Sequence, residues 1–443
     1  MEGIATKPTF HKYPAYKDSG VEWLGEIPEY WEIGKLGTLL KPISIKNRPD
    51  LPLLSITREE AVIERNIEDD SENHNFIPDD LSGYKLLKEG QFGMNKMKAW
   101  QGSYGIAPMT GIVSPAYYVF DFNSSINPRF FHLAIRSKNY VAFFGQASDG
   151  VRVGQWDLSK TRMKEIPFFI PPIEEQTAIA AFLDDKTAKI DLAIVQKEKM
   201  IALLKERKQI IIQNAVTKGL NPNVKMKHSG VEWIGEIPEK WEVKRLKSIC
   251  KTYGRIGFRG YSTSDLVGEN EGAITISPSN IQGDFMYFEK CTYLSWAKYH
   301  ESPEIKIFKN DVLIVKTGST YGKVGIASNL ETEATINPQL LVFKDVLIDN
   351  EYFYEILNTS QIQIQINREV IGSTIPTISE YKILNMKVGF PPDEEIPEIM
   401  NYVKDVKFKF NQAIGLQEQQ IEKLKELKAT LIDGAVTGKI KVR

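Results

Sequence analysis

The residues of this chain with the most evident chemical potential form a glycine-rich run in its second half. The run Gly318-Ser319-Thr320-Tyr321-Gly322-Lys323-Val324 approaches the pattern of a phosphate-binding loop, whose backbone amides and lysine hold nucleotide phosphates. The two glycines are one residue too close together, however, and Val324 occupies the position where a hydroxyl must hold magnesium. We therefore interpret the run as a glycine-rich turn between two strands.

Two further catalytic motifs are approached in the same incomplete way. An amino-methyltransferase requires an asparagine before its proline pair, but Ile170 precedes Pro171-Pro172 and Phe390 precedes Pro391-Pro392. The stretch Phe143-Phe144-Gly145-Gln146-Ala147 lacks the second glycine of a Phe-x-Gly-x-Gly cofactor loop. The proline pairs are therefore expected to begin helices, where a missing backbone amide is tolerated.

A nuclease centre is matched only loosely. Asp284 followed by Glu304-Ile305-Lys306 fits an acidic residue plus Glu-x-Lys, a pattern so permissive that exposed charge at a strand edge explains it more simply. The five histidines show no metal-ligand spacing, and Cys250 and Cys291 form neither a C-x-x-C pair nor a disulfide framework. We therefore predict no catalytic residue, no cofactor and no metal site.

The sequence segments that must position these residues occur twice in the chain. Residues 19–36 and 229–246 are identical at 13 of 18 positions, a constant 210 residues apart. The Pro-Pro-x-Glu-Glu run at 171–175 recurs at 391–395, where the separation has become 220. The second copy therefore holds ten more residues between its repeated blocks. This pattern predicts an internal repeat with pseudo-two-fold symmetry, in which one frame surrounds two different domains.

A long amphipathic helix is predicted after each proline pair. From Ile173 to about Val216, and from Glu394 to about Val436, apolar residues recur every three or four positions with charged residues between them. Gly219 follows the first of these runs, as expected at a helix end. A helix of roughly 60 Å cannot bury its own apolar stripe, so we expect the two helices to pair with each other.

The sequence therefore predicts four parts. They are a first domain at 1–170, a first long spacer helix at 171–218, a second domain at 219–390 and a second long spacer helix at 391–443. Within the domains, strand-like runs such as 117–120 and 311–316 alternate with turns and short helices, which indicates a mixed α+β fold. Between the repeated blocks the two domains share only short sequence matches, such as Gly105-Ile106-Ala107 with Gly325-Ile326-Ala327.

Composition narrows the class of protein. With 42% hydrophobic and 10% aromatic residues the chain can build packed cores, and a net charge of -1 argues against a strongly basic, sequence-independent nucleic-acid binder. The N-terminus lacks the apolar region of a signal peptide, and no stretch approaches the roughly 18 apolar residues of a membrane span. We expect a soluble, cytoplasmic protein that does not engage a membrane.

A resemblance to the DNA specificity subunits of type I restriction-modification systems rests on three features. These are the repeated Ser-Gly-Val-Glu-Trp-(Leu/Ile)-Gly-Glu-Ile-Pro-Glu-x-Trp-Glu blocks, the Pro-Pro-x-Glu-Glu helix starts and the Gly318-Ser319-Thr320 turn. The resemblance covers nearly the whole chain and departs from the pattern at Ile396, where the first copy has Gln176. It implies an α/β fold of two mixed α+β target-recognition domains, joined by two long antiparallel helices in a coiled-coil-like pair.

The resemblance also implies a function and partners. The chain would be a non-catalytic subunit that reads a bipartite, asymmetric DNA site with one domain per half-site. Its partners would be double-stranded DNA, two adenine-N6 methyltransferase subunits and ATP-dependent translocase-endonuclease subunits. Two alternatives remain open: a self-sufficient restriction endonuclease, and a scaffold whose helices tether two protein-binding domains.

Candidate DNA-contacting residues combine glycine-rich loops with cations, hydroxyls and amides, the groups that bind phosphates and base edges. In the first domain they are Lys96, Lys98, Gln101, Ser103, Tyr104, Arg152 and Gln155. In the second domain they are Arg255, Arg259, Tyr261, Lys316, Thr317, Ser319, Thr320, Tyr321, Lys323, Ser373 and Thr374. The duplicated tryptophans Trp23, Trp31, Trp233 and Trp241 are instead expected to be structural, because base-reading residues should differ between the two domains.

Overall fold

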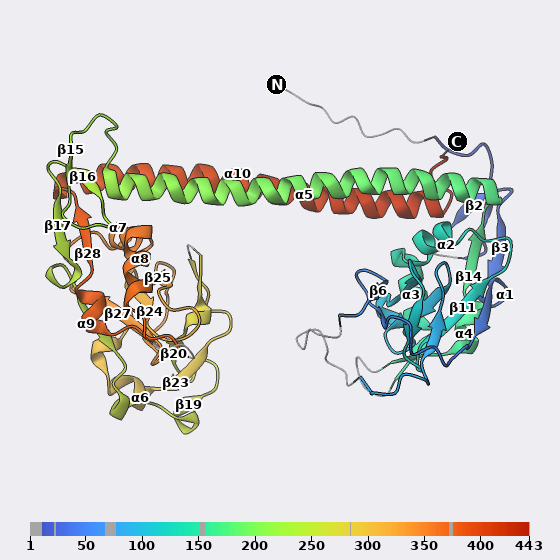
Figure 1. Cartoon of the computed structure of the whole chain (residues 1–443), viewed down its shortest axis with the longest axis horizontal. Helices are drawn as coiled ribbons and strands as arrows, with labels where there is room; N and C mark the ends of the chain where they lie inside the picture. The colour runs from blue at the N-terminus through green and yellow to red at the C-terminus, as the bar shows by residue number, and fades with distance from the viewer. Residues whose placement is uncertain are drawn as a thin grey trace. The chain divides into compact units, whose positions relative to one another are not determined.

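The computed structural model describes residues 11–21, 24–66, 77–150, 156–283, 285–371 and 375–442. The chain divides into two compact units, one formed by Met1–Glu198 with Glu418–Arg443 and the other by Lys199–Gln417. Each unit contains one domain of mixed strands and helices and part of each of two long helices (Figure 1). None of the described helices has an apolar stretch sufficient to cross a bilayer.

The described residues of the first domain form short strands and four short helices. Its strands are β1 (Tyr16–Asp18), β2 (Glu26–Pro28), β3 (Glu32–Lys35), β4 (Leu40–Ile43), β5 (Leu54–Ile56), β6 (Val62–Glu64), β7 (Lys85–Leu87), β8 (Phe92–Met94), β9 (Tyr104–Ile106), β10 (Gly111–Val113), β11 (Tyr118–Phe122), β12 (Ser148–Asp149), β13 (Asp157–Leu158) and β14 (Pro167–Ile170). Its helices are α1 (Leu36–Leu39), α2 (Pro128–Ile135), α3 (Lys138–Gln146) and α4 (Lys160–Glu165), with a 3-10 turn η1 (Ala99–Gln101). The central sheet is antiparallel, with the strand order β4-β11-β8-β9.

The second domain has the same kinds of elements. Its strands are β15 (Met226–His228), β16 (Glu236–Pro238), β17 (Glu242–Arg245), β18 (Lys251–Gly254), β19 (Leu266–Val267), β20 (Gly272–Ile276), β21 (Ile281–Gln282), β22 (Phe285–Met286), β23 (Thr292–Ser295), β24 (Val312–Val315), β25 (Val324–Ile326), β26 (Ala334–Ile336), β27 (Leu340–Lys344) and β28 (Lys387–Phe390). Its helices are α6 (Trp296–His300), α7 (Asn350–Leu357), α8 (Ser360–Glu369) and α9 (Glu380–Leu384). Its 3-10 turns are η2 (Leu246–Ser248), η3 (Gly257–Arg259), η4 (Thr263–Asp265), η5 (Pro278–Asn280), η6 (Pro303–Ile305) and η7 (Asp393–Glu395).

One antiparallel sheet is built twice, because β18-β27-β24-β25 in the second unit repeats β4-β11-β8-β9 in the first. Pro42 and Phe92 flank the same residue of β11, and Thr252 and Val312 flank the same residue of β27. The residues of β18 thus follow their equivalents in β4 by 210 positions, whereas those of β24 follow their equivalents in β8 by 220 positions. The ten additional residues lie between these strands, in the segment that holds β19, β20 and β23.

The repeated blocks supply buried anchors rather than surface features. Trp31 and Trp241 are both 0% exposed and therefore cannot stack on a base. The strands that follow them, β3 and β17, pair with β14 and β28, which lead into the long helices. Glu395 accepts a hydrogen bond from the Trp241 indole at 3.0 Å, and in the first copy Glu175 accepts bonds from tyrosine hydroxyls instead. The repeated sequence thus fixes each domain to the start of its helix.

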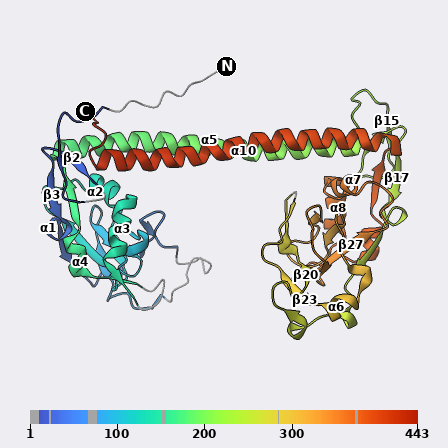
Figure 2. The ribbon, with the colours of Figure 1, turned by 180° about the vertical axis from the view of Figure 1, so that it is seen from behind.

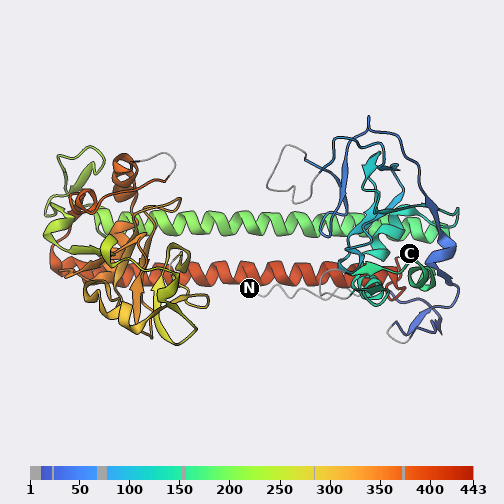
Figure 3. The same ribbon diagram turned by 90° about the horizontal axis from the view of Figure 1, so that it is seen from below.

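Two long helices follow the proline pairs: α5 (Ile173–Lys218), of 46 residues, and α10 (Ile396–Val436), of 41 residues. Within the first unit the Lys428 ammonium lies 2.7 Å from the Asp191 carboxylate, and within the second the Lys208 ammonium lies 3.2 Å from the Asn411 amide oxygen. Residue numbers increase along α5 while those of the contacting residues on α10 decrease, so the two helices are antiparallel. They lie side by side in Figures 1 and 3. The predicted fold class, two mixed α+β domains with two long antiparallel helices, is confirmed.

Candidate nucleic-acid interface

The first candidate surface is the loop that joins β8 to β9, residues 95–103. It closes through η1 and Gly102, whose φ of 94° favours glycine because it has no Cβ. Lys96 forms an ion pair with Asp157 at 2.7 Å, and its carbonyl accepts the Leu158 amide at 3.1 Å. These contacts tie the β8–β9 loop to β13, while Lys98 lies exposed and Gln101 half-buried on its surface.

The two residues at the end of this loop lie in the core. Ser103 is 2% exposed and Tyr104 is 0% exposed. The Tyr104 ring lies 4.6 Å from the Phe144 ring, and burial raises the pKa of its hydroxyl. The Arg136 guanidinium braces this end of the loop by donating to the Tyr104 carbonyl at 2.8 Å. Since neither Ser103 nor Tyr104 presents its side chain to solvent, we leave both out of the proposed contact set.

A cluster of four lysines lies around Lys85, and only one of the four, Lys96, was predicted from the sequence. It consists of Lys46, Lys85, Lys96 and Lys160, and we call it the lysine cluster. Burial first, and then the charges of the other three lysines, lower the pKa of Lys85. The Lys85 ammonium donates to the Tyr117 carbonyl at 2.6 Å, and the Lys160 ammonium lies 5.8 Å from the Tyr118 ring centre. Mutual repulsion of this kind makes a polyanion a favourable ligand.

The second candidate surface is the equivalent loop of the other domain, residues 316–323 between β24 and β25. Gly318 and Gly322 have φ values of 107° and 79°, and the Gly322 amide donates to the Val315 carbonyl at 2.8 Å. Ser319 and Thr320 are exposed at the tip. Because a strand rather than a helix follows, these residues form a hairpin turn and not a phosphate-binding loop.

The surroundings of the β24–β25 loop differ chemically from those of the β8–β9 loop. The Lys316 carbonyl accepts the Ile378 amide at 2.9 Å, and the Thr317 hydroxyl lies 3.4 Å from that of Thr377. A side chain at Gly254 would meet both the Lys316 ammonium and the Glu380 carboxylate, so these two charges lie close together.

The remaining members of this loop are partly covered. The Tyr321 hydroxyl donates to the Asn367 amide oxygen at 3.0 Å, and Lys323 is half-buried. At the shared separation of 220 residues, Lys316 corresponds to Lys96, Thr377 to Asp157 and Glu380 to Lys160. One position of the repeated fold therefore carries two different sets of polar groups.

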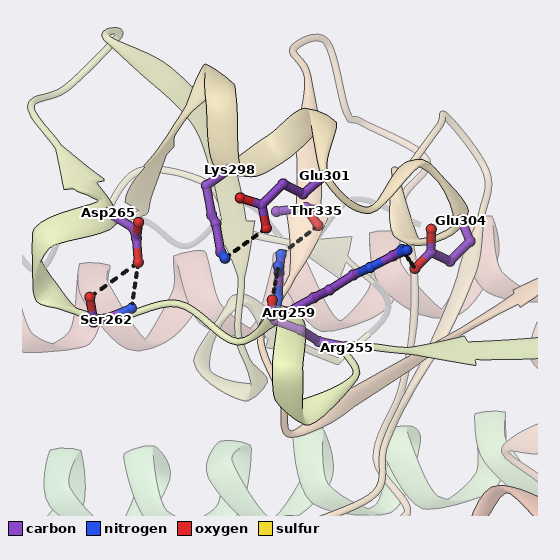
Figure 4. Close-up of polar contacts among 8 residues, drawn as sticks. All are labelled: Arg255, Arg259, Ser262, Asp265, Lys298, Glu301, Glu304 and Thr335. Atoms are coloured by element: carbon purple, nitrogen blue, oxygen red, sulfur yellow. Dashed lines mark hydrogen bonds and ion pairs between the residues drawn. The ribbon is translucent and has the colours of Figure 1, made fainter.

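Arg255 is a structural residue rather than a surface contact. It is 6% exposed, and its guanidinium donates to the Ile336 carbonyl and the Thr335 hydroxyl, each at 3.0 Å. Figure 4 shows this side chain directed toward Thr335, and Arg259 next to Glu304, with which it pairs at 3.2 Å. The Tyr261 ring lies 5.2 Å from the Arg255 guanidinium. Arg255 thus braces the loop after β18, on which Arg259 is only half-buried and Tyr261 is partly accessible.

Several predicted residues lie outside the described part of the chain: Arg152, Gln155, Ser373 and Thr374 in the contact set, and Asp284 in the nuclease pattern. The two other residues of that pattern have local partners, since Glu304 pairs with Arg259 and the Lys306 ammonium lies 3.0 Å from His300 Nδ1. Across the described residues, no group of three or more His, Cys, Asp or Glu side chains is arranged to hold a metal ion.

The fold defines a two-domain protein in which one loop occurs at equivalent positions of both domains, and comparison with known proteins identifies the family. The family model for the type I restriction modification DNA specificity domain matches residues 86–202 and 238–426. This chain belongs to that family, and it is therefore a specificity subunit, the non-catalytic component of a type I restriction-modification system.

Curated relatives agree with this assignment, and solved structures share the fold. The putative type I restriction enzyme MjaX specificity subunit of Methanocaldococcus jannaschii is 24% identical over 98% of both chains. The MjaVIII specificity subunit of the same organism is 25% identical, but the match spans 65% of each chain, just under two thirds. The match to the crystal structure of the HsdS subunit from Thermoanaerobacter tengcongensis covers 94% of this chain and 98% of the HsdS chain, with 16% identity and a TM-score of 0.51.

A second solved structure, from work on complex assembly and conformational transition of the type I R-M system, matches with a TM-score of 0.66 and 16% identity. It covers 94% of this chain and 99% of its own. At such identities the two solved structures support the fold alone.

Proposed function

We propose that this subunit reads a bipartite, asymmetric DNA sequence, with the first domain contacting one half-site and the second domain the other. The observation that carries the proposal is the pair of equivalent loops with different chemistry. The β8–β9 loop lies beside Lys160 and Asp157, whereas the β24–β25 loop lies beside Glu380 and Thr377. Two domains of one fold that read different bases need this combination of shared backbone and divergent side chains.

Within each domain we assign different roles to the accessible residues. Lys96, Lys98 and the lysine cluster supply phosphate contacts for the first domain, and Gln101 supplies an amide for a base edge. In the second domain Lys316 and Lys323 contact DNA phosphates. The hydroxyls that are available to the DNA belong to Thr317, Ser319, Thr320 and Tyr321. The cluster residues outside the sequence prediction, Lys46, Lys85 and Lys160, come from separate segments that meet only in the fold.

The two long helices serve in this proposal as the spacer. A helix of 46 residues extends about 69 Å at the usual rise. Half-sites read from one face of a duplex are commonly about 34 Å apart, or a multiple of that distance. A helix pair of this length is therefore sufficient to set the gap between two half-sites.

The same helices also offer docking surfaces for partner subunits. Leu192, Val195, Leu203 and Ile210 of α5 are each more than half exposed and recur at helical spacing. Exposed apolar stripes of this kind favour burial against another protein. We assign them to two adenine-N6 methyltransferase subunits, to which ATP-dependent translocase-endonuclease subunits are added, in a cytoplasmic complex.

The direct test is methylome sequencing of cells that carry this subunit with its partner methyltransferase and no other modification system. The proposal predicts N6-methyladenine in one motif with two defined halves separated by unspecified bases. Methylation in a single uninterrupted motif, or no sequence preference at all, would contradict it. A chain without the partner methyltransferase is the control and should leave the DNA unmodified.

A further inference from the structure

Each domain is held on its long helix by an ion pair at the same place, and the charges of the two pairs are reversed. In the first unit the Arg129 guanidinium of α2 binds the Asp184 carboxylate of α5 through two nitrogens, at 2.5 and 2.9 Å. In the second unit the Glu351 carboxylate of α7 lies 2.7 Å from the Lys404 ammonium of α10. Figure 2 shows α7 beneath α10.

These pairs occupy equivalent positions. Helices α2 and α7 each have eight residues, and the Asn127 and Asp349 side chains cap their N-termini by accepting backbone amides. Arg129 and Glu351 each lie two residues beyond the cap. Asp184 and Lys404 are separated by the same 220 residues as the Pro-Pro-x-Glu-Glu helix starts. At this docking position the domain therefore supplies the cation and the long helix the carboxylate in the first unit, whereas in the second unit the domain supplies the carboxylate and the helix the cation.

A second position one turn along the helices strengthens the difference. In the second unit Glu355 is only 5% exposed and forms an ion pair with Lys407, which also lies 5.3 Å from the Tyr354 ring centre. The corresponding residues of the first unit are Leu133 and Thr187, each 9% exposed. The second interface thus buries a charged pair where the first buries uncharged side chains.

Placing one domain on the helix of the other would break both positions. Against α5, Glu351 would face Asp184, and the buried Glu355 would face Thr187 without a cation. Against α10, Arg129 would face Lys404 in the same way. Exposed pairs contribute little, because water screens them. A buried carboxylate without its partner is costly, so Glu355 and Lys407 dominate the mismatch.

We propose that these residues form a docking code that matches each domain to its own long helix. The unit that can be exchanged between such chains is then not the domain alone. It is the domain together with the first turns of its helix, to Thr187 in the first copy and to Lys407 in the second. This inference concerns domain docking and does not depend on which DNA bases are read.

The test places the second domain on both helices of the full-length chain by replacing residues 37–170 with 247–390. This chain is compared with one that also carries Asp184→Lys and Thr187→Lys, and the same two helix substitutions are made in the native chain. Thermal unfolding and soluble yield are the readouts. The docking code predicts opposite signs: the two lysines raise the unfolding midpoint of the duplicated chain by about 4–8 °C and lower that of the native chain.

A second arm uses the native chain alone. Arg129→Glu should lower the unfolding midpoint, and combining it with Asp184→Lys should restore part of the loss. The matched control is reversal of Lys225 and Glu239, an exposed pair in which neither residue belongs to a long helix, which should leave the midpoint within about 1 °C. The proposal is overturned if the helix lysines act with the same sign in both chains, or if the duplicated chain fails to fold with and without them.

Discussion

The lysine cluster allows a quantitative prediction about DNA binding. Lys46 and Lys160 are exposed, and neither has an acidic partner within the described structure, whereas Lys96 is paired with Asp157. Each lysine that neutralises a phosphate releases counterions and contributes about 0.9 to the slope of log affinity against log salt. Replacing Lys46 and Lys160 by glutamine should therefore reduce this slope by about 1.8, with the largest loss of affinity at low salt.

The assay is equilibrium binding of the reconstituted methyltransferase complex to duplex DNA over a series of salt concentrations. Lys189→Gln is the matched control, because Lys189 is an exposed lysine of α5 that pairs with Asp185. It should leave the slope unchanged. An unaltered slope in the double variant, or an equal reduction in the control, would refute the assignment of the cluster to phosphate contacts.

Three further predictions follow from named contacts. Burial lowers the pKa of His132 to about 4, so between about pH 6.5 and 4 the unfolded chain binds a proton that the folded chain excludes. The free energy of unfolding should therefore fall by up to about 3 kcal/mol as the pH drops through this range. His132→Gln should flatten this pH dependence in thermal unfolding. Arg255→Met should destabilise the second unit by about 2–4 kcal/mol in denaturant unfolding through lost buried hydrogen bonds, whereas Lys251→Met, at an exposed pair, should change it by less than about 1 kcal/mol. Adding one helical turn to α5 within 197–209 and to α10 within the facing 411–420 should lengthen the gap in the methylated motif by one or two base pairs, because a turn rises about 5.4 Å; an unchanged gap would show that the helices do not set it.

The sequence was sufficient to predict the duplicated architecture because identity and periodicity are local signals. The change of separation from 210 to 220 predicted ten extra residues in the second copy, and the sheet register now locates them between β18 and β24. Helical spacing after each proline pair likewise predicted α5 and α10. Such features are visible without knowledge of how distant segments meet.

The candidate interface was less predictable, because accessibility and clustering depend on tertiary contacts. Tyr104 and Arg255 are residue types that often bind DNA, yet Tyr104 packs on Phe144 and Arg255 bonds to the Ile336 carbonyl. Conversely, Lys160 stands far from Lys96 in the chain and joins it only through the fold. The one available sequence signal was the 220-residue correspondence of Lys160 with Glu380, which marks a repeated position with different chemistry.

The central claim, one half-site per domain, is tested most directly by exchanging a single domain and sequencing the methylome. Residues 37–187 should be replaced by the equivalent domain and docking turns of another specificity subunit, with the rest of the chain unchanged. We expect one half of the methylated motif to change, while the other half and the gap remain as in the native complex. A motif that is unchanged, or one in which both halves change together, would contradict it.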